Sequence, residues 1–200
     1  NIQPENKLTL FEWGLWGKMM GAFGGCCAMR KNLFEPIPHN VSVDDVDLAM
    51  ITIEKEMKCI CDDEAICFED VSNQIQQEFK RKSRISAGNF QNLNRFRKFI
   101  FKPFTAVGFC FLSHKVFRWW GSFALIVILF CSLFLAVKFM LYKILLVAVL
   151  LLLLSPLVDF IQKKIGWNNY FIRLASYFVW MNIALLAGFV NYKKGIATNI

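Results

Sequence analysis

Apolar and polar positions divide the chain into two halves with different patterns. Up to about Lys98 the apolar residues are interspersed with charged and polar ones, as in a globular domain. From Gly121 to Val190 long apolar runs dominate, and a bilayer core requires about 20 such residues per helix. We therefore expect a soluble region over residues 1–98 and a transmembrane region over residues 119–200. Three spans are predicted: about Trp119–Val137, Ile144–Phe160 and Tyr170–Val190.

The segment between these halves, residues 99–118, has a mixed pattern. Pro103 begins an apolar run that is too short to cross a bilayer, and Lys102, His114 and Lys115 bracket it. This arrangement is typical of an amphipathic helix that lies in the membrane interface. We predict an interfacial helix here.

In the soluble half, a helix is predicted after Pro36 and Pro38. Ser42 has capping-box spacing to Asp45, and the pattern continues to about Lys58. An apolar stripe consists of Val46, Met50 and Ile53. Acidic residues in the first turn of a helix complement its dipole, which is the simplest reason for the acids found here.

Two short strands are predicted next, Lys58–Cys61 and Ala65–Phe68, on either side of an acidic turn. Helices alternating with strands indicate an α/β domain, and about 100 residues is thin for a complete one. We expect the C-terminal part of such a domain.

A basic helix is predicted over Gln76–Gln91. Steps of three and four residues place Gln77, Arg81, Arg84 and Gly88 on one stripe. Arginine offers a planar fork of donors that suits phosphate oxygens, and glycine lets a ligand approach the backbone. Basic clusters beside membrane helices also bind anionic lipid, so the spacing alone leaves both interpretations open.

The distribution of charged residues predicts how the chain is oriented in the membrane. The chain has 23 Lys and Arg against 15 Asp and Glu, and the basic residues concentrate between Lys80 and Arg118. The positive-inside rule predicts that this segment is cytoplasmic, with the spans running out, in and out and Lys193 on the far side. Asn182, in the third span, is predicted to bond to a neighbouring helix. The seven cysteines include no C-x-x-C pair, which favours reduced thiols.

The order of these parts resembles the processive family 2 glycosyltransferases, which include the cellulose, chitin, hyaluronan and poly-N-acetylglucosamine synthases. Val43-Asp44-Asp45 looks like the family's Thr-Glu-Asp motif. Arg81-Lys-Ser-Arg84-Ile85 stands where the family has Gln-x-x-Arg-Trp, keeping the Arg but not the Gln or Trp. Phe23-Gly-Gly-Cys26 looks like the loop that contacts the acceptor. The resemblance covers nearly the whole chain.

The resemblance implies a GT-A-type fold and inverting transfer from a nucleotide-sugar donor to a growing polysaccharide or glycan acceptor. Asp45 would be the general base, with Asp44 as the second acid of its motif. Arg84, Arg81 and Lys80 would bind the diphosphate. The acceptor loop would consist of Phe23, Gly24, Gly25 and Cys26. The lipid bilayer is the other expected partner, nucleic acid is not expected, and the resemblance leaves an accessory subunit open.

The resemblance also places a divalent metal, Mg²⁺ or Mn²⁺, on an Asp-x-Asp motif that precedes the acceptor loop. Nothing upstream of Gly21 supplies this motif, and Asp45-Val-Asp47 coincides with the base motif instead. We therefore expect the metal ligands outside this chain. We also expect the chain to be a C-terminal fragment without the nucleotide-binding half, and to be inactive alone.

A non-enzymatic alternative is a multi-pass membrane anchor whose basic helix binds lipid or a partner. It predicts that Arg81 and Arg84 face the bilayer, away from Asp45. The enzyme hypothesis predicts that they share a cleft with Asp45.

Overall fold

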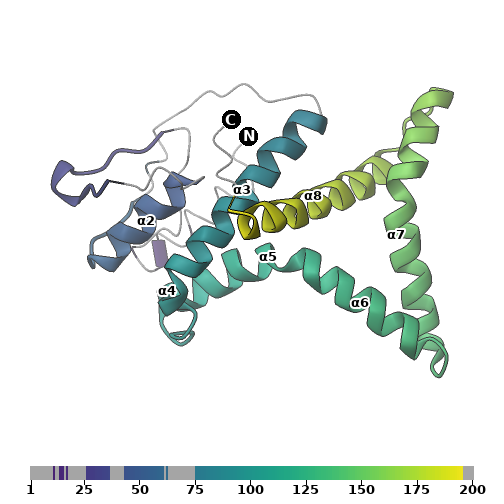
Figure 1. Cartoon of the computed structure of the whole chain (residues 1–200), viewed down its shortest axis with the longest axis horizontal. Coiled ribbons are helices and arrows are strands. Elements are labelled where there is room, and N and C mark those ends of the chain that lie inside the picture. Colours follow the sequence, from purple (N-terminus) through teal and green to yellow (C-terminus); the bar gives the residue numbers. More distant parts are fainter. Residues whose placement is uncertain are drawn as a thin grey trace.

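The computed structural model describes residues 26–36, 43–60, 62 and 75–195, together with four positions among residues 11–17. All regular secondary structure in these residues is helical (Figure 1). The elements are η1 (Lys31–Leu33), α2 (Asp44–Glu54), α3 (Ile75–Arg95), η2 (Arg97–Phe99), α4 (Ala106–Cys110), the π-helix η3 (Phe111–Val116), α5 (Phe117–Trp119), α6 (Gly121–Leu135), α7 (Met140–Ile165) and α8 (Tyr170–Lys193).

The predicted strand at Lys58–Cys61 is wrong over the residues that the structure describes. Residues 58–60 follow helix α2 as irregular backbone and pair with no strand in the described part of the chain. Ala65–Phe68 lies outside the described residues. The described residues are thus helical rather than α/β, and a run of four apolar and polar residues was too weak a pattern to specify a strand without a partner.

Helix α2 begins where the sequence predicts and ends earlier. Its N-cap is Val43, which offers no side-chain cap, and Ser42 lies outside the described residues. Its last helical residue is Glu54, and Glu56 then adopts a positive φ of 59°, which is incompatible with continuing to Lys58.

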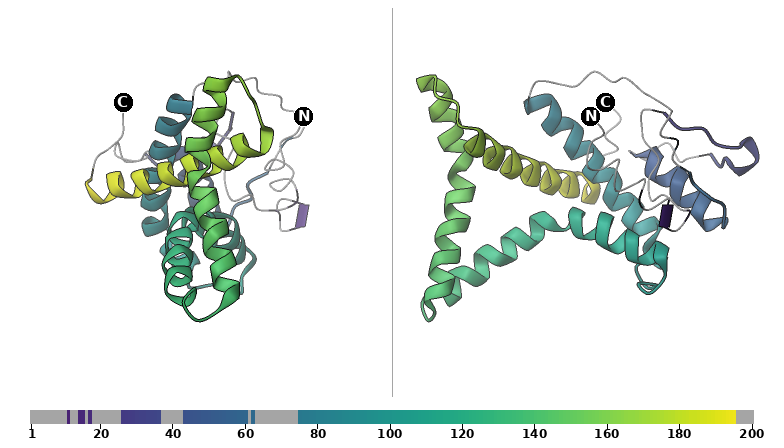
Figure 2. Two further views of the ribbon diagram at one scale, coloured as in Figure 1. Left: turned by 90° about the vertical axis from the view of Figure 1, so that its right-hand side faces the viewer. Right: turned by 180° about the vertical axis from the view of Figure 1, so that it is seen from behind.

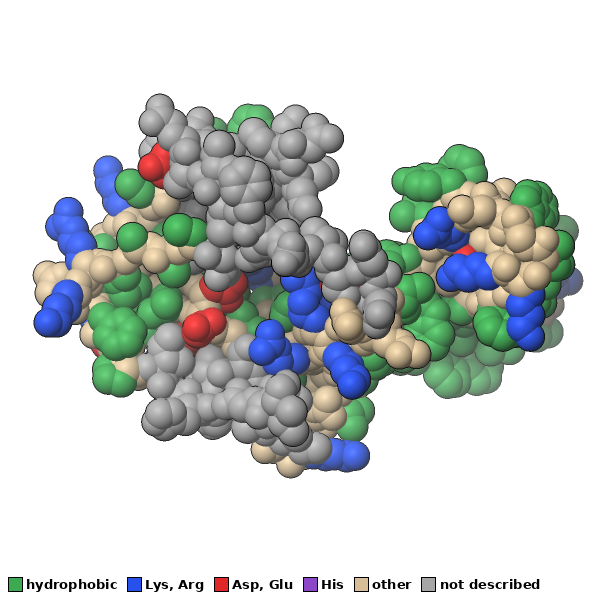
Figure 3. Space-filling model, turned by 90° about the horizontal axis from the view of Figure 1, so that it is seen from above, with side chains coloured by type: hydrophobic (Ala, Val, Ile, Leu, Met, Phe, Trp, Pro, Cys, Tyr) green, Lys and Arg blue, Asp and Glu red, His purple; other side chains and the backbone are tan. Residues whose placement is uncertain are grey.

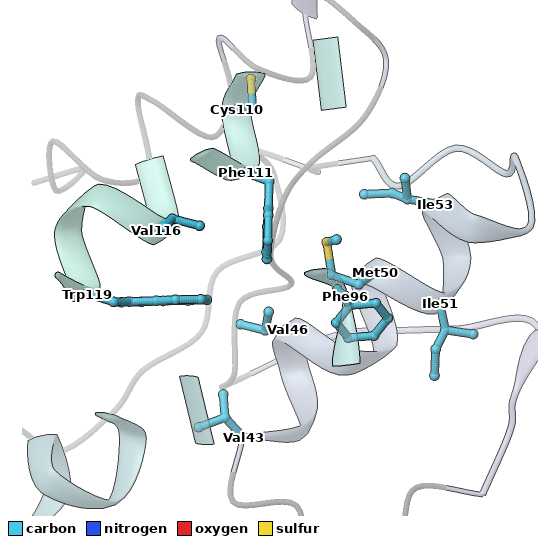
Figure 4. Packing of buried hydrophobic residues seen from close by; sticks show 10 residues of the cluster. All are labelled: Val43, Val46, Met50, Ile51, Ile53, Phe96, Cys110, Phe111, Val116 and Trp119. Carbon is cyan, nitrogen blue, oxygen red and sulfur yellow. The ribbon is translucent and has the colours of Figure 1, made fainter. Parts of the chain in front are cut away.

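The core of the soluble half joins α2 to the segment that precedes the membrane helices (Figure 4). The predicted stripe of Val46, Met50 and Ile53 is buried, which confirms the helical periodicity. These residues pack against Phe111 and Trp119, whose rings meet edge to face at 6.0 Å. The segment from α4 to α5 therefore has one face in the core.

The opposite face of this segment is exposed. Phe109 and Phe117 are more than half exposed, while the neighbouring Cys110 and Val116 are buried. Thr105 caps the segment by accepting a bond from the Gly108 amide at 3.1 Å. A two-faced helix is present, although its regular part begins at Ala106 and includes a π-helical turn. Its place in the membrane interface remains a prediction.

Three apolar helices follow and form the sides of an open triangle (Figures 1 and 2). Helices α6 and α8 converge on α3 and α5, and α7 joins their other ends. Helices α7 and α8 are each long and apolar enough to cross a membrane. Helix α6 reaches that length only together with Ala106–Trp119, from which it is bent by 60°. The described residues thus contain two membrane-length helices, or three if the bent pair is one span.

The end of α8 lies beside α3. Asn191 donates to Ser83 Oγ at 3.4 Å, and the Tyr192 ring stacks on Phe90 at 6.2 Å between centroids. The basic residues at the end of α8 therefore lie close to the basic helix α3. The side of the membrane on which Lys193 lies stays a prediction.

Candidate functional site

The start of α2 rests on the basic stripe of α3. A Cβ built on Gly88 would lie 2.5 Å from Val43 Cγ2 and 2.9 Å from the Val43 amide nitrogen. Asn92, one turn further along, donates to the Val43 carbonyl at 3.3 Å. The close approach to Gly88 is thus made by α2 itself, and not by a ligand as the sequence had indicated.

Asp45 lies at this junction. It is half-buried, and its Oδ1 accepts a bond from the Val46 amide at 2.7 Å. Burial raises the pKa of the Asp45 carboxyl, and the neighbouring Asp44 carboxylate adds to that rise. The Val46 bond and the positive charge of Lys115 oppose it. The carboxyl is therefore a weak acid for an aspartate and remains within reach of solvent.

Lys115 was not singled out from the sequence as part of this site. It lies in the π-helix η3, and its charge acts on Asp45 although 70 residues separate them. π-Helical turns often occur at functional sites. The core explains the proximity, since Val46 beside Asp45 packs in the same cluster as Val116 beside Lys115. The sequence had placed Lys115 only on the predicted interfacial helix.

An ion pair fixes α2 on α3. The Asp47 side chain is fully buried, and its Oδ2 accepts from Arg95 Nη1 at 2.7 Å. Burial raises the pKa of Asp47, and the Arg95 charge opposes that rise. The other oxygen, Oδ1, has no partner in the described structure. No local sequence pattern predicted this pair, because its members are 48 residues apart.

The arginines assigned to diphosphate binding lie on the same stripe, toward the start of α3. At 100° per residue, Arg84 lies one turn before Gly88, the residue that Val43 covers. Arg84 and Lys80 are exposed and have no acidic partner among the described residues, while Arg81 pairs with Glu78 at 3.2 Å. Val43, two residues before Asp45, covers Gly88, and the charges that act on Asp45 are those of Lys115 and Asp44.

The reverse face of α3 packs on the membrane helix α8. Phe79 meets Trp180 edge to face at 6.1 Å, and Ser86 donates to the Leu185 carbonyl at 2.9 Å. Helical geometry places these two positions about opposite to Arg84. Figure 3 shows acidic side chains close to several Lys and Arg side chains on one face of this half.

The remaining predicted residues are only partly described. Cys26 is an exposed free cysteine. Phe23, Gly24 and Gly25 lie outside the described residues. Within the described part of the chain, no three His, Cys, Asp or Glu side chains are grouped to hold a metal ion. The described residues therefore offer no site for the divalent metal that the resemblance implies.

Comparisons with family models, with curated proteins and with solved structures gave no match for this chain.

Proposed function

We propose that this chain is the acceptor and base half of a membrane glycosyltransferase that transfers a sugar from a nucleotide-sugar donor to a growing glycan. One observation carries the proposal. The acidic start of α2 docks on the stripe of α3 that bears Arg84, and that stripe is turned away from the membrane helix α8. A base and a diphosphate-binding cation on one aqueous face are what glycosyl transfer requires.

Asp45 is the candidate general base. An inverting transfer needs a carboxylate to take the proton from the attacking sugar hydroxyl, and a base works best when its pKa lies close to the working pH. The raised pKa of Asp45 moves the carboxyl in that direction. The Val46 bond and the Lys115 charge oppose this rise. Asp44, beside it, is exposed.

Arg84 is the candidate cation for the leaving diphosphate. Negative charge grows on the leaving group in the transition state, and a guanidinium already in place stabilises it. Arg84 and Lys80 have the free donors for this role in the described structure, and Arg81 would have to leave Glu78. The Mg²⁺ or Mn²⁺ of such enzymes would be held outside the described residues.

The test is a pair of neighbouring substitutions in this protein. Asp45→Asn should abolish sugar transfer, with a loss of at least about 100-fold because general-base catalysis contributes about 10²–10⁴-fold. Binding of the nucleoside diphosphate, measured by calorimetry, should be unchanged. Asp44→Asn is the matched control and should keep most of the transfer. Near-normal turnover by Asp45→Asn would disprove the assignment.

The anchor hypothesis has less support. It requires the basic stripe to face lipid, whereas the face of α3 that meets a membrane helix is the one with Phe79 and Ser86. The net basic charge of the chain is its remaining support.

A further inference from the structure

An apolar hollow of about 320 Å³ lies between α7 and α8, remote in the fold from Asp45. It is lined by Leu151, Leu152, Ser155, Val158, Phe171, Ile172 and Ala175. Its volume falls at the lower end of the roughly 300–1,000 Å³ typical of ligand pockets. Six of its seven lining residues are apolar, so it suits a hydrocarbon chain.

One polar group in the hollow has no partner. Ser155 is 6 % exposed, and its Oγ makes no hydrogen bond in the described structure. The next residue, Pro156, has no N–H, so the Leu152 carbonyl also loses its usual helical donor. A buried hydroxyl without a partner costs free energy. A ligand with an acceptor oxygen at this depth would satisfy Ser155.

A charged rim lies directly beyond the hollow. Asp159, one turn after Ser155, is 4 % exposed and accepts from Lys163 Nζ at 2.6 Å and from Gln162 Nε2 at 2.8 Å. Lys164 on α7 and Arg173 on α8 are exposed nearby. Asp159 is the only acidic residue after Glu78 in the sequence. Three cations against one carboxylate leave this rim positive.

Exposed aromatic side chains also lie at this junction of α7 and α8. Trp167, in the turn between α7 and α8, is 65 % exposed, and Tyr170, the first residue of α8, is 71 % exposed. Rings of this kind are enriched at the headgroup level of membranes. Figure 3 shows basic side chains around an acidic one at the end of the molecule where α7 and α8 meet.

We propose that the junction of α7 and α8 binds one anionic phospholipid. Its phosphate lies among Lys163, Lys164 and Arg173, and one acyl chain fills the hollow. The Ser155 hydroxyl donates to an ester carbonyl of the lipid. The geometry fits because Ser155 lies about 6 Å along the helix axis from Asp159, at 1.5 Å per residue, and a glycerolipid carries its esters a few ångströms beneath its phosphate. A second protein helix would match the apolar hollow but not the positive rim.

The test uses the chain in phosphatidylcholine vesicles that contain a trace of phosphatidylglycerol with a photoactivatable group in its acyl chain. Ultraviolet light should label the peptides that carry the hollow, and unlabelled phosphatidylglycerol should compete far better than phosphatidylcholine. Ala175→Phe, which fills the hollow, should reduce labelling there to the level of an unirradiated sample. Leu150→Phe, at an exposed position on α7, is its matched control and should label normally.

Charge variants provide an independent test that does not disturb the hollow. The pair Lys164→Gln and Arg173→Gln should weaken competition by phosphatidylglycerol about 20-fold or more, since each cation near a headgroup contributes about 1 kcal/mol, or about fivefold. The pair Lys138→Gln and Lys143→Gln removes two cations at the other turn of α7 and should have little effect. Equal competition by phosphatidylcholine, or unchanged labelling of Ala175→Phe, would overturn the proposal. Cross-linking of two chains through the hollow would overturn it in favour of a second copy.

Discussion

The two halves of the molecule bury different mixtures of side chains. In the soluble half, α2 encloses Val46, Met50 and the ion-paired Asp47 and exposes Asp44. In the membrane half, α7 encloses Ser155 and Asp159 and exposes leucines and valines along its length. An isolated polar group is costly in hydrocarbon, so polar side chains gather where helices meet. Apolar content therefore identifies a membrane helix, whereas the few polar and small residues of that helix determine its contacts with other helices.

Helix α3 connects the two halves through two glycine contacts. Gly88 on α3 receives Val43 of α2, and Gly188 on α8 receives Ser83 and Ser86 of α3. On one side the contact brings a carboxylate toward the basic stripe. On the other it fixes the helix to the membrane region. Each of the following predictions disturbs one of these two sides.

The largest effect is expected on the soluble side, from Arg95→Met. It would leave Asp47, which is fully buried, without its cation. Breaking a buried pair costs about 3–5 kcal/mol, and we expect about 3 kcal/mol because Arg95 is partly exposed. Chemical unfolding of the solubilised protein would measure this loss, with Arg97→Met at an exposed position as the control.

The stability lost in Arg95→Met should become smaller as the pH falls. Burial raises the pKa of Asp47 above its ordinary value of 3.8, so the folded state holds that proton more tightly than the unfolded chain. The stability gained from this tighter proton binding by Asp47 is therefore complete below pH 3.8. It is lost as the pH rises through the folded-state pKa of Asp47. Removing Arg95 raises that pKa further, so the cost of Arg95→Met should shrink on acidification. A cost that is independent of pH would contradict the pairing.

A smaller effect is expected on the membrane side, from Gly188→Ala. The added Cβ would lie 2.5 Å from the Ser83 carbonyl oxygen, which is backbone and cannot turn aside. Overpacking of this kind costs about 1–3 kcal/mol, measurable as a lower melting temperature. Gly121→Ala is the control, since its nearest neighbour would be Asn182 Oδ1 at 3.9 Å. Equal melting temperatures for the two variants would argue against the contact between α3 and α8.

The smallest effect is expected from Ser122→Ala. Ser122 Oγ of α6 donates to Asn182 of α8, with the Oδ1 oxygen at 3.2 Å. Bonds between membrane helices average about 0.6 kcal/mol, so a loss of that size is expected. Ser132→Ala removes a bond within one helix, to the Leu129 carbonyl, and serves as the comparison. A Ser122→Ala effect no larger than that of Ser132→Ala would mean that this bond contributes nothing between helices.

The sequence predicted the features that depend on local patterns. The basic helix, the start of α2 at its acidic turn and the two long apolar helices were all predicted close to their observed positions. The bond of Asn182 to a neighbouring helix is confirmed, because a polar residue in an apolar run has few other partners. These predictions need only the periodicity of a few turns.

The features that the sequence missed depend on residues far apart in the chain. The Arg95–Asp47 pair, the approach of Lys115 to Asp45 and the return of α8 to α3 all join distant segments. The 60° bend before α6 falls close to the predicted boundary between the interfacial helix and the first span, but the sequence did not predict its angle. Strand formation at residues 58–60 was over-predicted, since no sequence pattern there specified a partner strand.

The central claim is that α3 has two faces, with Arg84 toward the aqueous site and Phe79 and Ser86 toward α8. A nitroxide at Arg84→Cys, in a background without the native cysteines, tests it in vesicles. Collisions with a water-soluble nickel chelate should dominate over collisions with oxygen, opposite to a label at Leu154→Cys, which is exposed on the apolar surface of α7. A label at residue 84 that is sheltered from nickel and open to oxygen, as at residue 154, would contradict the account.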